Sequence, residues 1–437
     1  MKMTGWMSRW SSALVLLALP AGLLAQDAAR AITLDDAVRL ARRNAPAAVQ
    51  ARNAVRQSAV SARTSFAAFF PTLSFSSGAS RSEGVALQPD GSLRPIVRPW
   101  NANHGLTTNL EIFDGGRRFF NYRAAQANVD ASEASETSQN FTVTLSVKQQ
   151  YFAVLAAREQ ESAAAKQLEQ AQQQMRAAVA RVAAGAATRS DSLRSSIQVG
   201  NALLAVLTAQ NSLASANAAL SRLVGSTAIV TAVVSDTADT GELSMANDEL
   251  LSLAEQGPLV RQATSQLGAA KQSLRAARTP YLPTLALRFG ASYQSGTNDF
   301  ALWGDQDNYQ YSTNVSVSYP LWNGGSREEN VVRARISEEN ANASMRDARL
   351  NGRQQMIQQL GAFRTALARV QIQLASVTAG EEDLRVQTER YNLGAGTLLD
   401  LITSQSTLIT ARQALIQARL DARTAMAQIE ALIGRDL

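Results

Sequence analysis

The chain has 437 residues, 46% of them hydrophobic, so it is long enough for more than one domain and for a substantial core. It contains no cysteine, which excludes disulfides, thiolate metal ligands and cysteine nucleophiles. The formal net charge of +6 comes from arginines spread singly along the chain rather than from a basic run, so we expect no nucleic-acid binding.

Residues 1–25 are typical of a secretory signal peptide. Lys2 and Arg9 supply positive charge, a short apolar run follows, and Ala25 is a plausible cleavage position. The alternative is a membrane anchor, but this run is well short of the roughly 20 residues that a helix needs to span a bilayer. No later segment is long and apolar enough either, so a chain that crosses a membrane would have to do so with strands.

Four short motifs occur twice, in the same order and 209 to 212 positions apart. FFPTL returns as YLPTL, FDGG as WNGG, RVAAGAATRSD as RYNLGAGTLLD, and LVG as LIG. A fixed period of this kind indicates a duplicated structural unit. We therefore predict a first repeat at residues 26–225, a connector at 226–247 and a second repeat at 248–437.

Each repeat contains two stretches in which apolar and polar residues alternate, the pattern of a strand with one apolar and one polar face. The alternation is clearest at 284–293 and 309–319 and weaker at 72–76 and 106–112. A half-buried hairpin of a soluble protein would show it too. Aromatic residues near the ends of the apolar faces favour a membrane barrel, where such residues form two girdles; they are Phe113, Tyr293, Trp303, Tyr309, Tyr311, Tyr319 and Trp322.

Long polar loops are expected between the paired strands, at roughly 80–103 and 295–308. Their proline, glycine, asparagine and aspartate residues are not expected to continue a strand ladder. His104, the single histidine of the chain, falls at the edge of the first loop with no partner that suggests catalysis. We interpret it as a bystander.

Beyond the FDGG and WNGG motifs the chain becomes helical. Residues 117–184 contain no proline or glycine and would extend for roughly 100 Å. The second repeat matches this at about 326–393, with three glycines as interruptions. The returning helices carry seven-residue repeats, which favour coiled-coil packing, and their many small and polar residues suit a wall around a wet interior. A conventional coiled-coil bundle is the alternative.

The turn at the end of each helical hairpin has the pattern Gly-x-x-Thr-x-x-Asp. Glycine ends the outgoing helix, threonine caps the returning one, and the aspartate is placed to complete a capping box. A structural role alone explains both aspartates, and a further functional role stays open. The residues are Gly185, Thr188, Asp191, Gly394, Thr397 and Asp400.

Four strands cannot close a membrane barrel, because an open sheet edge is not viable in lipid and known barrels have at least about eight strands. The chain must therefore oligomerise. Two copies would supply eight strands and three copies twelve, and the strand count alone does not choose between them.

The duplication, the prolines before the strands, the FDGG/WNGG pair and the two hairpin tips together resemble the TolC family of outer-membrane efflux channels, over essentially the whole mature chain. The resemblance implies a mainly α fold with a small membrane β-barrel portion. It also implies a homotrimer in which four strands per chain form a twelve-stranded barrel and long helical hairpins extend across the periplasm. The tips would form an iris that opens when a periplasmic adaptor and an inner-membrane pump dock.

By the same resemblance, Asp191 matches the tip aspartate of the family, Tyr391 its gate tyrosine and Asp400 an aspartate at the constriction. Gly185, Thr188, Gly394 and Thr397 would form the tip turns that contact the adaptor. The family's gate arginine and a deeper aspartate are replaced here, so the usual lock is incomplete. The replacing residues are Gly396 and Thr403, and we expect contacts of Arg189 or Arg390 to compensate.

We therefore predict a passive exit duct in the outer membrane for an efflux or type I secretion system, with no enzyme activity, cofactor or metal. The chain has no phosphate-binding loop, so energy would come from a partner. A periplasmic coiled-coil scaffold or adaptor without a barrel is the alternative, but it leaves the alternating strands unexplained. The polar strand faces would line the lumen with Asn109, Glu111, Arg288 and Asn314.

Overall fold

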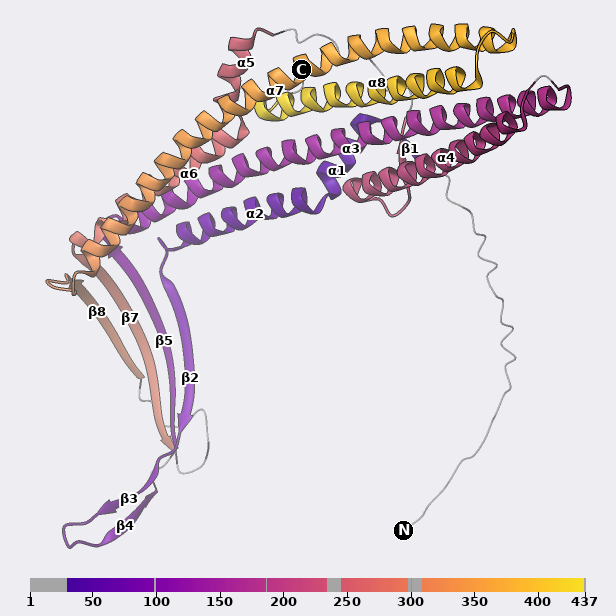
Figure 1. Ribbon diagram of the computed structural model, residues 1–437. Helices are drawn as coiled ribbons and strands as arrows, with labels where there is room; N and C mark the ends of the chain where they lie inside the picture. Colours follow the sequence, from indigo (N-terminus) through magenta and orange to yellow (C-terminus); the bar gives the residue numbers. More distant parts are fainter. Residues whose placement is uncertain are drawn as a thin grey trace, which may run out of the picture.

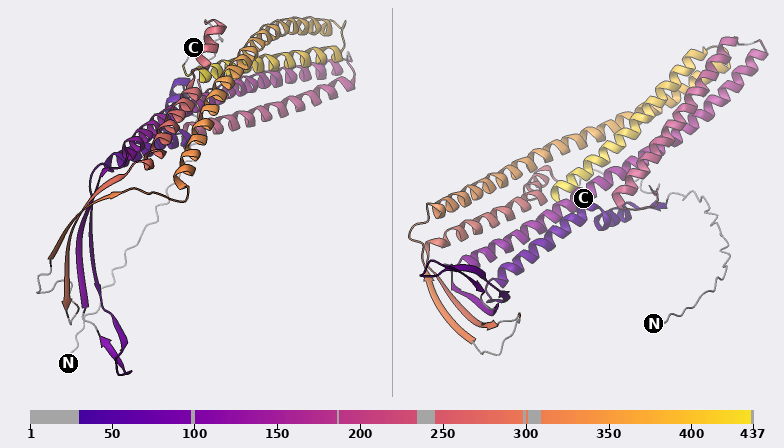
Figure 2. Two further views of the ribbon diagram at one scale, coloured as in Figure 1. Left: turned by 90° about the vertical axis from the view of Figure 1, so that its left-hand side faces the viewer. Right: turned by 90° about the horizontal axis from the view of Figure 1, so that it is seen from below.

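The computed structural model describes residues 30–97, 100–185, 187–233, 245–297, 300 and 309–435. The predicted signal peptide lies outside these ranges, as does most of the predicted loop at 295–308. The molecule is elongated, with a sheet at one end and long helices that run side by side away from it (Figures 1 and 2).

The main sheet has four strands: β2 (Thr72–Ser80), β5 (Trp100–Phe113), β7 (Thr284–Thr297) and β8 (Tyr309–Ser318). Their order is β2-β5-β7-β8, and all neighbours are antiparallel. Each repeat thus contributes the hairpin predicted for it, and the pairing of β5 with β7 joins the two hairpins. β2 and β8 are the edges, so the sheet is open in the single chain.

The register brings the apolar faces of the four strands together, because residues directly opposite in an antiparallel ladder lie on one face. Phe75 is opposite Leu106, Leu106 opposite Ala291, and Ala291 opposite Tyr311. Large side chains on this face are exposed, with relative exposures of 66% for Phe75 and 71% for Val317. A continuous exposed apolar surface of this kind marks an interaction with lipid or protein.

The predicted loop at 80–103 is wrong over most of its length. A second small hairpin occupies it, formed by β3 (Glu83–Leu87) and β4 (Leu93–Val97) around a turn in which Gly91 has a φ of 77°. Pro95 lies within this ladder opposite Val85. A two-stranded ribbon has only edge strands, and an edge strand tolerates a residue without an N–H group.

His104 lies inside β5 and not at a loop edge, because β5 already begins at Trp100. Its ring is stacked on those of Phe75 and Tyr293, with centroids 6.4 and 5.8 Å away, and it is 6% exposed. These are the contacts of a packed side chain on the apolar face.

The long helices match in length between the repeats. α3 (Arg117–Ala183) and α7 (Ser326–Asn392) have 67 residues each, and α4 (Arg189–Val224) and α8 (Leu398–Ile433) have 36 each. α7 runs unbroken through the three glycines expected to interrupt it. Shorter helices lead into the strands, namely α2 (Pro46–Ala67) and α6 (Pro258–Ala277), the latter followed by the 3₁₀ turn η2 (Thr279–Tyr281).

The helices form two rows that share α3 and α7. Near the sheet, the order is α2, α3, α6, α7; towards the hairpin tips, it is α4, α3, α8, α7 (Figure 2). The coiled-coil prediction for α8 is supported by the burial of Leu401, Leu408, Ala422 and Ile429, which recur at multiples of seven residues; Leu415, in the same repeat, is half-buried.

Two apolar clusters fix the middle of the molecule. In the first, β1 (Arg30–Ile32) pairs in parallel with β6 (Val230–Ala232), and both pack with α1 (Leu34–Asn44) against α3 and α4. The buried Tyr151 hydroxyl donates to Ile32 O and accepts from Val233 N, both at 3.1 Å. The second cluster joins α5 (Asn247–Ala254) to α7 and α8. β6 lies in the predicted connector.

Candidate functional site

The hairpin tips lie at the far end of the molecule from the sheet (Figure 1). Gly185 and Gly394 follow the ends of α3 and α7 with φ values of 73° and 76°, a conformation that glycine adopts without a Cβ penalty. The N–H of Gly185 donates to Val182 O at 3.0 Å, and that of Ala395 to Arg390 O at 2.8 Å. Both turns are therefore closed by backbone bonds that satisfy the last helical carbonyls.

Each returning helix begins with a capping box, as predicted. The backbone N–H and the hydroxyl of Thr188 donate to Asp191 Oδ2 at 3.0 and 2.8 Å. Thr397 makes the same two bonds to Asp400 Oδ2 at 3.1 and 2.8 Å. These bonds lower the pKa of both carboxyl groups: the Thr188 backbone N–H contributes most at Asp191, and the Thr397 hydroxyl at Asp400.

One arginine connects the two tips of the chain. Arg181, in the last turn of α3, donates from Nη1 to Tyr391 O at 2.9 Å, and its guanidinium lies 4.6 Å from the centroid of the Tyr391 ring. Arg181 also contributes to the lowered pKa of Asp191. A bond to the backbone plus a cation–π contact holds the gate tyrosine suggested by the resemblance against the neighbouring hairpin.

The sequence did not single out Arg181, although it begins the first copy of the repeated tip motif. The expected compensating residues make fewer contacts: within the described part of the chain, the side chains of Arg189 and Arg390 form no hydrogen bond or ion pair, and Arg390 contributes only through its charge to the lowered pKa of Asp400. At Gly396, a Cβ atom would lie 3.2 Å from Arg390 Cβ and 3.3 Å from Tyr391 N. The backbone is therefore tightly packed where the family has its arginine.

The polar residues predicted for the lumen lie together on the polar face of the sheet. Arg288 is opposite Asn109 on one side and Asn314 on the other. Its Nε donates to Asn109 Oδ1 at 2.7 Å. Glu111 lies two residues further along β5 and pairs with Arg117 at 3.3 Å. The four predicted residues thus form one polar group across β5, β7 and β8.

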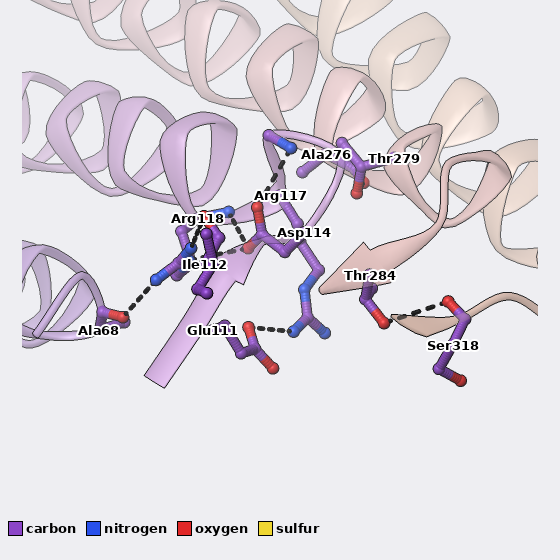
Figure 3. A network of polar contacts seen from close by, with 11 residues as sticks. Ala68, Glu111, Ile112, Asp114, Arg117, Arg118, Ala276, Thr279, Thr284 and Ser318 are labelled. Atoms are coloured by element: carbon purple, nitrogen blue, oxygen red, sulfur yellow. Dashed lines mark hydrogen bonds and ion pairs between the residues drawn. The ribbon is translucent and has the colours of Figure 1, made fainter. Parts of the chain in front are cut away.

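A buried ion pair marks the corner where β5 turns into α3 (Figure 3). Asp114 accepts from Gly116 N at 3.1 Å and from the backbone and Nε of Arg118 at 3.0 and 3.1 Å. Arg118 also donates to Ala68 O at 3.3 Å, which ties the corner to the end of α2. The FDGG motif was a landmark of the duplication, but its aspartate was not recognised as the anchor of the corner.

No group of three or more His, Asp or Glu side chains in the described ranges is arranged to hold a metal ion. None of the helices in those ranges combines the length and apolar character that a membrane-spanning helix needs.

Comparison of the sequence with models of known protein families assigns this chain to a family. The model of the family "Outer membrane efflux protein" matches residues 36–226 and 250–435. The chain is 27% identical over 386 residues to the pyoverdine export outer membrane protein OpmQ of Pseudomonas aeruginosa, which covers 87% of this chain and 79% of OpmQ.

Two solved structures show the same fold. The outer membrane protein VceC of Vibrio cholerae superposes with a TM-score of 0.74 at 18% identity, over 92% of this chain and 96% of VceC. The open state of the MtrE outer membrane channel of Neisseria gonorrhoeae superposes with a TM-score of 0.76 at 20% identity, over 92% of this chain and 89% of MtrE. With the repeats, the sheet and the hairpins described above, these matches establish that the chain belongs to the outer membrane efflux protein family and is an outer-membrane efflux channel of TolC-like fold.

Proposed function

We propose that three copies of this chain form a passive exit duct that works with a periplasmic adaptor and an inner-membrane pump. The observation that carries the proposal is the four-stranded sheet with an exposed apolar face and two unpaired edges. In lipid, each backbone group left unpaired costs several kcal/mol, so further copies have to close the sheet. Twelve strands from three copies leave room for a channel.

The duct itself performs no chemistry in this proposal. The sequence contains no phosphate-binding loop, and the polar group around Arg288 suits a wetted surface over which solutes pass. Transport energy therefore comes from the pump, and the chain supplies the path. The adaptor contacts the tip turns at Gly185, Thr188, Gly394 and Thr397, in the hairpin ends that point away from the sheet (Figure 1).

The gate of this proposal lies at the tips, and Arg181 is its latch. Arg181 reaches from the first hairpin to the backbone and ring of Tyr391 on the second, so the hairpins cannot separate without losing both contacts. Asp191 and Asp400 serve mainly as helix caps, which keep each tip rigid while the hairpins move as units.

Cell fractionation separates this proposal from the scaffold or adaptor alternative. We expect the protein in the outer-membrane fraction, as a band on unheated SDS gels that converts to the monomer on boiling. A periplasmic protein whose migration does not change with heating would support the alternative and contradict the duct.

The latch is tested by single-channel conductance in planar bilayers. Arg181→Ala removes a charge-assisted hydrogen bond and a cation–π contact, together about 2 kcal/mol, so we expect the open probability to rise at least tenfold. Arg390→Ala is the matched control, because Arg390 occupies the equivalent position of the second repeat without these contacts within the described part of the chain. Equal effects of the two variants would contradict the assignment.

A further inference from the structure

We propose that β8 of one copy pairs with β2 of the next copy in the register that β5 and β7 use within the chain, so that Ser318 lies opposite Ser76. The proposal rests on the proposed trimer and specifies its subunit junction residue by residue. It follows from the duplication, which makes one junction of the ring visible inside the single chain.

The first step is that the strands of the two repeats are equivalent in three dimensions. Thr72 is opposite Asn109 in the first hairpin, and Thr284 is opposite Ser318 in the second. Each threonine hydroxyl donates to the carbonyl of its opposite residue, at 3.4 and 3.3 Å. β2 therefore corresponds to β7 with an offset of 212 positions, and β5 corresponds to β8 with an offset of 209.

The second step transfers the junction between repeats from inside the chain to the ring. In the β5–β7 ladder, Asn109 is opposite Arg288. The equivalent of Asn109 is Ser318 on β8, and the equivalent of Arg288 is Ser76 on β2. The same transfer places Trp322 opposite Leu73, since Phe113 is opposite Leu285. The register also places Val315 opposite Ala79 and Tyr319 opposite Phe75 on the apolar face, while Ser318 and Ser76 meet on the polar face.

The turns that connect the strands to the long helices also indicate that β2 of the next copy lies beside β8. At Gly115, an added Cβ would lie 2.7 Å from Thr279 O and 3.0 Å from Leu282 Cβ, so this corner packs tightly on the start of the second hairpin. Gly324 is the equivalent corner, and a Cβ there would meet nothing within 4 Å. The residues equivalent to Thr279 and Leu282 are Ala67 and Phe70, which the next copy would bring to Gly324.

Residues at the free edge of the chain are also more exposed than their equivalents at the junction between the repeats, as expected if a second copy covers the edge. Trp322 is 81% exposed, whereas its equivalent Phe113 is 47% exposed. Among the helices, Leu408 of α8 is buried, whereas its equivalent, Val199 of α4, is half-buried at the edge of its row. A second copy of the chain fits this surface, because it carries the complementary edge with the required spacing.

Disulfide trapping tests the register in the full-length protein, which has no cysteine of its own. Ser76→Cys with Ser318→Cys should yield covalent dimers and trimers from outer membranes under mild oxidation, because opposite strand residues lie within the Cα distance of a disulfide. Asn109→Cys with Arg288→Cys is the control for the template and should close within one chain. Ser74→Cys with Ser318→Cys is shifted by two residues on the same face, at a Cβ distance of roughly 7–8 Å, and should not cross-link.

Cross-linking of the shifted pair instead of the Ser76/Ser318 pair would overturn the proposed register. If that protein still formed a heat-modifiable trimer, the proposed function as a duct would not be affected. The same conclusion would follow if neither pair cross-linked in a trimer in which the control pair had closed. A protein that never formed the trimer would contradict the proposed function itself.

Discussion

The two repeats follow the same path but finish their barrel corners with different chemistry. In the first corner, Asp114 accepts three hydrogen bonds and pairs with Arg118. In the second, the equivalent residue is Asn323, whose Oδ1 is buried without a hydrogen-bond partner in the described part of the chain. Arg327, the equivalent of Arg118, donates instead to Pro320 O at 3.1 Å.

What both corners keep is backbone geometry. Each has two successive glycines with φ between 67° and 86°. Each also has an arginine over an aromatic ring: Arg118 lies 5.4 Å from Phe69, and Arg327 lies 5.0 Å from Tyr281. A ring of alternating repeats closes only if its helices and turns match, so length and turn angle have to agree, whereas individual ion pairs are free to differ.

The largest expected difference between the corners concerns the buried acid. Asp114→Ala leaves the charge of Arg118, which is 12% exposed, without its partner, and should lower the free energy of unfolding by about 3–5 kcal/mol. Asn323→Ala should cost about 1 kcal/mol or less, because that side chain is poorly satisfied already. Urea titration of the detergent-extracted trimer measures both, and equal losses would show that the corners are energetically alike.

On the strands, we expect the repeats to behave alike. Leu106 and Val315 are equivalent residues on the apolar face, and arginine at either should destabilise the membrane-embedded form by about 2–4 kcal/mol. Thr107→Arg and Ser316→Arg place the same charge one residue away on the polar face and should leave the trimer intact. The yield of heat-modifiable trimer in outer membranes is the readout. If the trimer formed with Leu106→Arg but not with Thr107→Arg, the assignment of the lipid-facing and polar faces would be reversed.

At the tips, the caps should again be equivalent. Thr188→Ala and Thr397→Ala each remove a capping hydroxyl and should weaken the first turn of the returning helix by about 1 kcal/mol. Amide hydrogen exchange of the first turns of α4 and α8 would then be about fivefold faster in each variant. Serine at either position retains the hydroxyl and should restore protection. A change in one tip without the other would mean that the caps are not equivalent.

The smallest expected effect is a pH dependence shared by both tips. The pKa values of Asp191 and Asp400 are lowered in the fold by their threonine partners, so their stabilisation is complete above the usual carboxyl pKa. It is lost only as the pH falls below about 4, through the lowered values. A spin label attached to an Ala187→Cys variant should gain mobility in that range, and Asp191→Asn should abolish the change. A change in the mobility of the spin label between pH 6 and 8 would show that the pH dependence does not come from the titration of Asp191.

Much of the fold was predictable because periodic residue patterns and the positions of glycines determine it. Alternation revealed the strand faces, the absence of breakers set the ends of α3, and Gly-x-x-Thr-x-x-Asp gave the tips. β1 and β6 escaped prediction because three-residue strands carry no period, and the β3–β4 hairpin was hidden in a segment rich in turn residues.

Contacts between distant parts of the chain were also beyond the sequence. Arg181 and Tyr391 are 210 residues apart, and nothing in their local patterns pairs them. The same holds for Lys148 and Glu430, which form a largely buried ion pair of 2.5 Å between α3 and α8. Asp114 was visible as part of a repeated motif, but its burial depends on the packing of α2 beside α3.

The central claim is that one chain supplies a third of a closed, lipid-embedded ring. Native mass spectrometry of the protein extracted from outer membranes in detergent counts the chains in that ring directly. We predict three chains that stay together until the detergent complex is heated. A single chain that remains in solution without detergent would contradict the account.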